Sequence, residues 1–122
     1  MSDTITFCTV TVECPDAAAL AGFYAAITGG QMTVTGPWAT VRCPNGARID
    51  FQTAPGYQPP AWPDDASSMQ MHLDFDVDDL DATEARVVAA GATRFAYQPN
   101  DRCRVYADPA GHPFCLAAYD HD

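Results

Sequence analysis

The sequence predicts an α+β protein built from two tandem β-α-β-β-β modules, and three observations support this fold class. Segments with period-two alternation of apolar and polar side chains outnumber the two segments with helical spacing. The segments follow the same order in both halves of the chain. One sequence offset, 77 − 12 = 65, places Val77 on Val12 and also carries Pro44 onto Pro109. The fold is therefore expected to repeat internally.

The first module opens with the alternating stretch TITFCTVTVE, residues 4–13, which predicts a strand. Pro15 and Asp16 suit the start of a helix over residues 17–27, and Gly29 with Gly30 ends it. Three strands complete the module, at residues 31–35, 38–43 and 47–53, with a hairpin turn at Pro44-Asn45-Gly46 between the last two.

The second module repeats this order: a strand at 70–77, a helix at 80–90 ended by Gly91, strands at 93–98 and 102–107, a turn, and a strand at 112–119. A stretch rich in proline and small polar residues, 54–69, separates the modules. We therefore expect a single domain over residues 1–122, with module one at 4–53, a connector at 54–69 and module two at 70–119.

Composition excludes several classes of function. With sixteen acidic residues, six arginines and a net charge of −10, most of the surface repels a nucleic-acid backbone. An acidic surface attracts small cations, although simple solubility is the better explanation of it. No apolar run is long enough for a membrane span, and the N-terminal residues lack the pattern of a signal region. A cytoplasmic protein is expected. The five cysteines contain no CxxC pair, which favours reduced, mostly buried thiols.

The stretch MQMHLDFDVDDLD places charge on one side of a strand. If Leu73 and Phe75 pack under the helix, the alternation sends His72 and Asp74 to the opposite face. These two residues are either a binding site or a structural hydrogen-bonding pair, with Arg104 as a candidate charge partner. The aspartates at positions 78 and 79 are better explained as caps of the following helix.

The tandem modules, the FY pair followed by GG, and the stretches HLDFDVDDLDA and RVYADPAGHPFC resemble the vicinal oxygen chelate superfamily, which includes glyoxalases, bleomycin-resistance proteins and extradiol dioxygenases. The resemblance covers roughly residues 5–119. It implies curved mixed sheets around a cleft and a homodimer. It does not imply one chemistry, because this fold serves metal-dependent enzymes and metal-free drug-binding proteins alike.

The resemblance also implies positions for metal ligands, in the first and last strands of each module. His72 matches the ligand histidine of the second module, and its counterpart in the first is Phe7, or Thr9 if the register shifts. Asp50 and Cys115 stand where glutamates are usual. A phenyl ring or a threonine is a poor ligand, so no metal is expected. If one is present, Asp50, His72 and Cys115 would hold a zinc, iron or manganese ion.

Aromatic side chains near His72 and Asp74 would suit stacking against a planar ligand. Trp62 of the connector is the main candidate, although it fits equally well as a cap over apolar residues. The full set of expected ligand-binding residues is Phe7, Thr9, Asp50, Gln52, Trp62, His72, Asp74, Arg104 and Tyr106. His112 is explained by its turn.

The sequence thus favours a metal-free small-molecule binding protein, similar to drug-binding or self-resistance members of the superfamily. Its ligand is expected to be planar, and either neutral or cationic. The alternative is a lyase, isomerase or dioxygenase that uses a divalent metal at the altered site. A third reading is metal-free acid–base chemistry, with His72 as the base and Asp74 orienting it. Whether the protein is an enzyme stays open at this stage.

Overall fold

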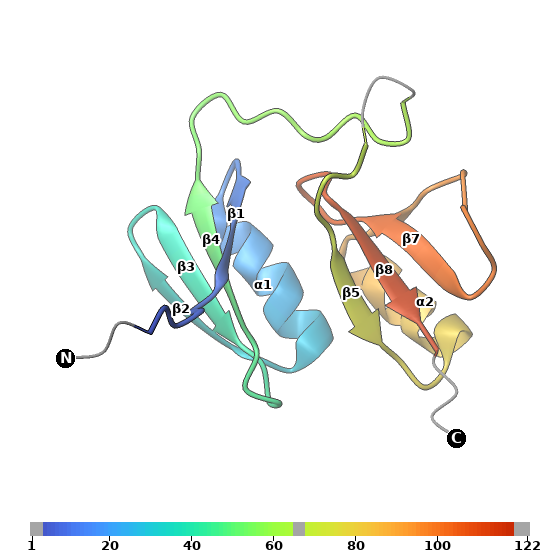
Figure 1. Ribbon diagram of the computed structural model, residues 1–122, viewed down its shortest axis with the longest axis horizontal. Coiled ribbons are helices and arrows are strands. Elements are labelled where there is room, and N and C mark those ends of the chain that lie inside the picture. The colour runs from blue at the N-terminus through green and yellow to red at the C-terminus, as the bar shows by residue number, and fades with distance from the viewer. Residues whose placement is uncertain (1–3, 65–67, 119–122) are drawn as a thin grey trace. The chain divides into compact units, whose positions relative to one another are not determined.

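The chain folds into two compact units, Met1–Tyr57 and Gln58–Asp122, each with one helix and one four-stranded sheet (Figure 1). The structure is a computed structural model that describes residues 4–64 and 68–118. Each unit has the order β-α-β-β-β, as the sequence predicts, so the α+β class and the two-module organisation are confirmed. The predicted connector is divided, with residues 54–57 in unit one and 58–69 in unit two.

Unit one contains β1 (Val10–Cys14), α1 (Ala17–Thr28), β2 (Gln31–Thr35), β3 (Trp38–Arg42) and β4 (Arg48–Thr53). Its sheet has the order β1-β4-β3-β2, in which β1 runs parallel to β4 and the other pairs are antiparallel. Asp16 caps α1 by accepting a hydrogen bond from the backbone N–H of Ala19, and Gly29 ends it in the left-handed conformation that favours glycine. Leu20, Phe23 and Tyr24 bury the apolar side of α1, with Tyr24 stacked on Phe51 of β4.

Unit two contains β5 (Leu73–Asp76), α2 (Leu80–Ala90), β6 (Thr93–Arg94), β7 (Cys103–Ala107) and β8 (Pro113–Ala117). The sheet order β5-β8-β7-β6 matches that of unit one, again with the first strand parallel to the last. Asp79 caps α2 through the N–H of Ala82, as expected for this aspartate.

Helix α2 is attached to its sheet differently from α1, because Val87 is its one buried residue. Polar contacts take the place of apolar packing. Glu84 accepts hydrogen bonds from the Tyr106 hydroxyl at 2.7 Å and from Arg94 at 3.0 Å. Asp81 binds Arg104 at 2.8 Å. A network of charged side chains therefore holds this helix.

Several strands are shorter than the sequence predicts. The strand expected at 93–98 ends at Arg94, because the side-chain amide of Gln98 takes over the edge of β7: it accepts from the N–H of Val105 at 2.9 Å and donates to its carbonyl at 3.0 Å. The strand expected at 70–77 begins at Leu73, since Gln70 has a positive φ of 61° that breaks the extended chain. The strand expected at 112–119 covers Pro113–Ala117. The last residue of that prediction, at position 119, lies outside the described residues.

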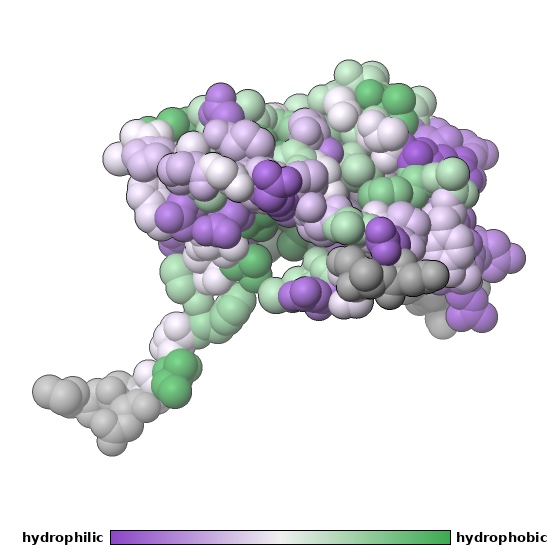
Figure 2. All heavy atoms as spheres, turned by 90° about the horizontal axis from the view of Figure 1, so that it is seen from above, coloured by the Kyte–Doolittle hydropathy of each residue, from purple (hydrophilic) through white to green (hydrophobic). Residues whose placement is uncertain are grey.

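The first strand begins at Val10, so the prediction of a strand from residue 4 is wrong. Residues 4–9 have no assigned strand, and the side chains of Ile5 and Phe7 are 96% and 79% exposed. Figure 2 shows apolar atoms in the segment that joins the grey N-terminal atoms to the rest of unit one. Without a neighbouring strand, the alternating pattern of this segment has no sheet to lie in.

The internal repeat also needs a correction. In the parallel pairs, Val10 lies opposite Ile49 and Leu73 lies opposite Phe114. The offset is therefore 114 − 49 = 65 in the last strands, as predicted, but 73 − 10 = 63 in the first strands. Val12 corresponds to Phe75 rather than to Val77. The counterpart of His72 is consequently Thr9, since 72 − 63 = 9, and not Phe7.

Neither helix in the described part of the chain has the length and apolar character that crossing a membrane requires.

Candidate functional site

The candidate site lies on the open face of sheet two, which we define as the side of β5, β8 and β7 opposite α2. Phe75 packs edge-on against Phe114, and Tyr106 stacks on Phe114 while its hydroxyl reaches α2, so these rings mark the helix side. Side chains alternate along a strand, so His72 and Asp74 lie on the other side, as predicted. Asp74 is the direct neighbour of Cys115 in the pairing of β5 with β8.

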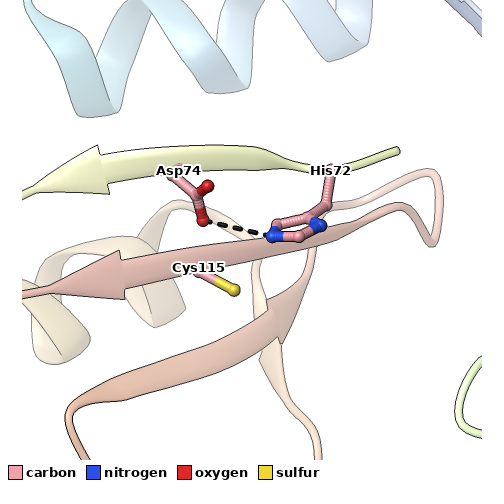
Figure 3. A group of neighbouring side chains, drawn as sticks. All are labelled: His72, Asp74 and Cys115. Carbon is pink, nitrogen blue, oxygen red and sulfur yellow. Dashed lines mark ion pairs between the residues drawn. The ribbon is translucent and has the colours of Figure 1, made fainter. Parts of the chain in front are cut away.

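Three side chains converge there: His72, Asp74 and Cys115 (Figure 3). The His72 Nε2 lies 3.2 Å from the Asp74 Oδ1. One nitrogen, one oxygen and one sulfur atom of the three residues all lie within 4.8 Å of one another. Cys115 is 5% exposed and forms the floor of this group, whereas the side chains of His72 and Asp74 are 35% and 61% exposed and form its rim. The group is therefore open to small solutes.

The electrostatic environment of Cys115 keeps its thiol protonated. Burial, with smaller contributions from the neighbouring Cys103 and Asp74, raises the pKa of this thiol to about 12. Cys103 belongs to β7 and faces the same side, because it pairs with Ala117, two residues along β8 from Cys115. A thiol with this pKa is a poor nucleophile at neutral pH. The arrangement does not support covalent catalysis by Cys115.

Unit one carries different groups at the equivalent positions. Thr9 and Thr11 replace His72 and Asp74, and Asp50 replaces Cys115. The Asp50 carboxylate already has partners: it accepts from Arg48 at 2.9 and 2.8 Å and from Thr40 at 2.8 Å. The hydrogen bonds from Arg48 are the main reason that the pKa of Asp50 lies below its ordinary value. Asp50 is thus a paired structural charge.

The donors of unit one do not fit a transition-metal site. Threonine hydroxyls are weak ligands for transition metals, and a metal at Asp50 would compete with the Arg48 guanidinium for the same oxygens. Asp50 is also on the opposite unit from His72 and Cys115, with which the sequence analysis grouped it. The carboxylate that the structure places beside them is Asp74.

Arg104 and Tyr106 were predicted to bind a ligand, and the structure directs both toward α2. The Arg104 guanidinium binds Asp81 and lies 3.5 Å from Glu84, so the expectation that it pairs with Asp74 is wrong. Strand alternation explains this placement, because positions 104 and 106 face the helix while 103 and 105 face the open side. These contacts attach the helix, and a role in ligand binding stays a prediction.

Trp62 lies against other aromatic rings of unit two, with its ring centroid 4.9 Å from that of Phe95 and 5.8 Å from that of Tyr97. This packing agrees with the view of Trp62 as a cap over apolar residues. Its proposed stacking on a ligand stays untested. In unit one, Gln52 is half-buried on β4, two residues from Asp50 and on the same side of the sheet.

His112 takes part in a turn, as the sequence suggests. The buried Asp108 carboxylate accepts hydrogen bonds from the backbone N–H groups of Ala110 and His112. It also lies 2.9 Å from the His112 ring Nδ1. These bonds hold the connection between β7 and β8 and so fix the start of the strand that carries Cys115.

Two pairings at these positions were not predicted from the sequence. Asp74 was named as a ligand-binding residue but not as a metal donor beside Cys115, and Arg48 was not recognised as the partner of Asp50. A signal existed in both cases. Arg48 and Asp50 are two positions apart on one strand, as are His72 and Asp74, and such residues share a face.

Comparison with known proteins agrees with this architecture. The family model described as glyoxalase-like domain matches residues 9–117. No curated protein matches the sequence. Among solved structures, the oxidase ChaP-H2 is 28% identical, with a TM-score of 0.67 and coverage of 96% of this chain and 95% of that one.

Two more distant structures show the same fold. The fosfomycin resistance protein FosX from Listeria monocytogenes is 15% identical, with a TM-score of 0.71 over 97% of this chain and 96% of its own. A glyoxalase/bleomycin resistance protein/dioxygenase family enzyme from Burkholderia phytofirmans PsJN is 20% identical, with a TM-score of 0.69 over 90% and 95% of the two chains. The family match spans nearly the whole sequence, and the paired β-α-β-β-β units are those of the glyoxalase/bleomycin-resistance fold. The chain therefore belongs to the glyoxalase-like domain family.

Proposed function

We propose that this chain is a metal-free small-molecule binding protein that holds a planar, cationic ligand on the open face of sheet two. The observation that carries this proposal is the lack of good metal donors in unit one. Thr9 and Thr11 stand at the positions equivalent to His72 and Asp74. The Asp50 carboxylate forms an ion pair with Arg48. Unit one therefore offers a weak threonine donor and a carboxylate that is already paired with a guanidinium.

Charge supports a cationic ligand. Asp74 and Asp76 lie on the open face, and the two arginines of this sheet, Arg94 and Arg104, bind acids of α2 on the other side. The net charge of −10 adds a long-range attraction for cations. The aromatic group around Trp62 belongs to the same unit and offers flat surfaces of the kind on which planar cations stack.

A fluorescence titration tests this proposal. The chain has two tryptophans, so a Trp38→Phe variant leaves Trp62 as the single reporter. With chelator present throughout, planar cationic dyes are expected to quench its emission saturably. Asp74→Asn is expected to weaken binding about tenfold, which corresponds to ~1.4 kcal/mol. Asp101→Asn, which removes an exposed charge elsewhere in unit two, serves as the matched control. Linear, unsaturable quenching, or equal effects of the two variants, would reject the proposal.

A second candidate function is a metal-dependent lyase, isomerase or dioxygenase. The specific observation in its favour is the convergence of His72, Asp74 and Cys115, which are all residues that can bind a metal. The similarity to a protein described as an oxidase is consistent with it. Turnover of a bound compound that chelation abolishes and added metal restores would favour this candidate over simple binding.

We also propose that the protein works in the cytoplasm. All five cysteines are free thiols, as is usual in a reducing compartment. Fractionation of the producing cells, with the protein detected by antibody, would contradict this if the protein were recovered outside the cytoplasm.

A further inference from the structure

We infer that Asn45 is a site of spontaneous covalent modification, at which the chain converts its own asparagine into aspartate and isoaspartate. The site is the hairpin turn between β3 and β4, where Asn45 is followed by Gly46 and both residues are exposed. The turn belongs to unit one and takes no part in the proposed ligand binding. Whether a ligand binds to sheet two therefore has no bearing on this modification.

The turn holds the two reacting groups together. The reaction begins when the backbone nitrogen of Gly46 attacks the side-chain carbonyl carbon, Cγ, of Asn45. The Asn45 Oδ1 accepts a hydrogen bond from the backbone N–H of Ala47 at 3.0 Å. Such a bond, from the backbone two residues ahead to the side chain, folds the side chain over the peptide between them. The electrophilic carbon is therefore kept beside its nucleophile.

The N–H of Ala47 also stabilises the charge that forms during the attack. As the nitrogen of Gly46 bonds to Cγ, negative charge develops on the Asn45 Oδ1, the atom to which this N–H already donates. A backbone donor about 2.7 to 3.1 Å from an oxygen that gains charge is the arrangement of an oxyanion hole. The donor is in place before the reaction, so no rearrangement is needed when the charge appears.

The turn is also open to the attack. Gly46 has a φ of 93°, and a Cβ built on it would meet no atom of the described residues within 4 Å. Because glycine lacks a side chain, its nitrogen is accessible. This nitrogen donates one hydrogen bond, to the carbonyl of Cys43 at 2.9 Å, and must release it to react. The bond lies at the exposed end of a hairpin, where local opening costs little free energy.

The reaction balances with water as the only other reactant. A bond forms between the nitrogen of Gly46 and the Cγ of Asn45, the Cγ–Nδ2 bond breaks, and ammonia leaves with the proton of the Gly46 nitrogen. The product is a five-membered succinimide ring. Water opens this ring at the side-chain carbonyl to give aspartate, or at the main-chain carbonyl to give isoaspartate. In isoaspartate the main chain runs through the side-chain carbon.

Isoaspartate is expected to disturb the hairpin, because it adds one methylene to the main chain of a tight turn. Arg42 pairs with Arg48 at the base of this hairpin, and the N–H of Cys43 donates to the carbonyl of Ala47 at 2.8 Å. A longer main chain strains both contacts. Strand β4, which follows the turn, pairs with both β1 and β3. The modification should therefore destabilise unit one.

Asn100 is a matched control inside the same chain, because the sequence contains only two asparagines. Its Oδ1 also accepts from the backbone N–H two residues ahead, that of Arg102, at 2.9 Å. The next residue is Asp101 instead of glycine, and its side chain shields the attacking nitrogen. Comparison of the two asparagines therefore isolates the contribution of Gly46.

Peptide mapping of the full-length protein, aged in mildly alkaline buffer, measures the modification. Trypsin releases Asn45 in the peptide 43–48 and Asn100 in the peptide 95–102, and each conversion adds about 1 Da. We expect the first peptide to gain this mass and to separate into aspartate and isoaspartate forms, while the second stays unchanged. Ala47→Pro removes the N–H donor and is expected to slow the loss of Asn45 about tenfold, the effect of ~1.4 kcal/mol on the barrier.

Since proline also changes the backbone of the turn, a second measurement compares the folded protein with the same protein unfolded in guanidinium chloride. The turn is lost there and the sequence is kept, so Asn45 is expected to convert at least as fast in the folded state. Slower conversion in the folded state, equal conversion of the two peptides, or an unchanged rate in Ala47→Pro would overturn the inference.

Asn45→Gln is the control for the effect on stability, because its longer side chain cannot close the five-membered ring. Ageing should lower the midpoint of urea unfolding of the wild type and leave that of Asn45→Gln unchanged. An equal decrease in both proteins would show that conversion at Asn45 does not disturb the hairpin.

Discussion

At the scale of single residues, two aspartates show how a neighbour decides the role of a charge. Asp50 and Asp74 both lie on strands and point away from the helix of their unit. Arg48 holds Asp50 through two hydrogen bonds, whereas Asp74 lies beside an imidazole and a thiol. The same side chain is therefore a structural ion-pair partner in one unit and a candidate ligand in the other.

Tyr106 leads to a prediction about alkaline pH. Burial, followed by the bond to Glu84, raises the pKa of its hydroxyl to about 12. In the unfolded chain a tyrosine ionises near 10, so between pH 10 and 12 the unfolded state loses a proton that the folded state keeps. The free energy of unfolding should therefore be unaffected by this group below pH 10 and fall by about 2 to 3 kcal/mol as the pH rises to 12.

Urea unfolding at several alkaline pH values, compared between the wild type and Tyr106→Phe, measures this effect. The variant lacks the ionisable hydroxyl, so its stability should depend less on pH, even though it is less stable at neutral pH. The other four tyrosines are the same in both proteins and cancel in the comparison. Identical pH dependence of the two proteins would show that Tyr106 ionises normally.

At the scale of secondary-structure elements, the two units build similar sheets but protect their edges differently. In unit one β2 forms a five-residue edge strand, and in unit two β6 has only two residues. The Gln98 side chain replaces the missing part of β6 by bonding both backbone groups of Val105. A single amide side chain thus takes the place of a strand.

The Gln98 contacts predict that Gln98→Ala destabilises the protein by about 1 to 3 kcal/mol, because the N–H of Val105 loses its partner. The carbonyl of Val105 keeps the hydrogen bond that it accepts from the N–H of Phe95. Amide hydrogen exchange of Val105 should accelerate in the variant. Gln31→Ala, on the exposed strand β2, is the control and should change stability by less than about 0.5 kcal/mol. An unchanged exchange rate at Val105 would mean that another group satisfies this N–H.

At the scale of the whole molecule, β2 leads us to propose the homodimer that the sequence analysis expects. All five residues of this edge strand are exposed, and none is charged or proline. Met32 and Val34 are large exposed apolar residues on it. An uncharged, regular, exposed edge is a site where another strand can pair. We propose that a second copy of the chain provides this strand, through antiparallel pairing of β2 with β2. The strand itself carries no charge, so the negative charge of the two chains does not oppose the pairing there.

Sedimentation equilibrium is expected to give a mass near 26.2 kDa, twice the 13.1 kDa of one chain. Val34→Lys places a charge on the edge and should reduce the mass to that of the monomer. Val88→Lys is the matched control, because Val88 on α2 is 47% exposed and Val34 is 44% exposed. A monomeric wild type, or dissociation by Val88→Lys alone, would exclude the β2 interface.

The sequence by itself determined the order of the elements, the positions of both helices and the faces of the strands. These features depend on residues a few positions apart: Asp16 and Asp79 cap helices that begin directly after them, and alternation around Leu73 and Phe75 places His72 and Asp74 on the open side. The family resemblance followed from the same local patterns, and the match over residues 9–117 confirms it.

Only the tertiary structure decided the strand register and the partners of each charged residue. The shift from 65 to 63 in the offset of the first strands arises from the pairing of β1 with β4 and of β5 with β8, which are distant in sequence. The same long-range pairing brings Asp74 beside Cys115. Folding within each unit also pairs Arg48 with Asp50, and Arg104 with Asp81 of α2. Local patterns specify which way a side chain points, but hydrogen bonds between distant strands specify what it meets.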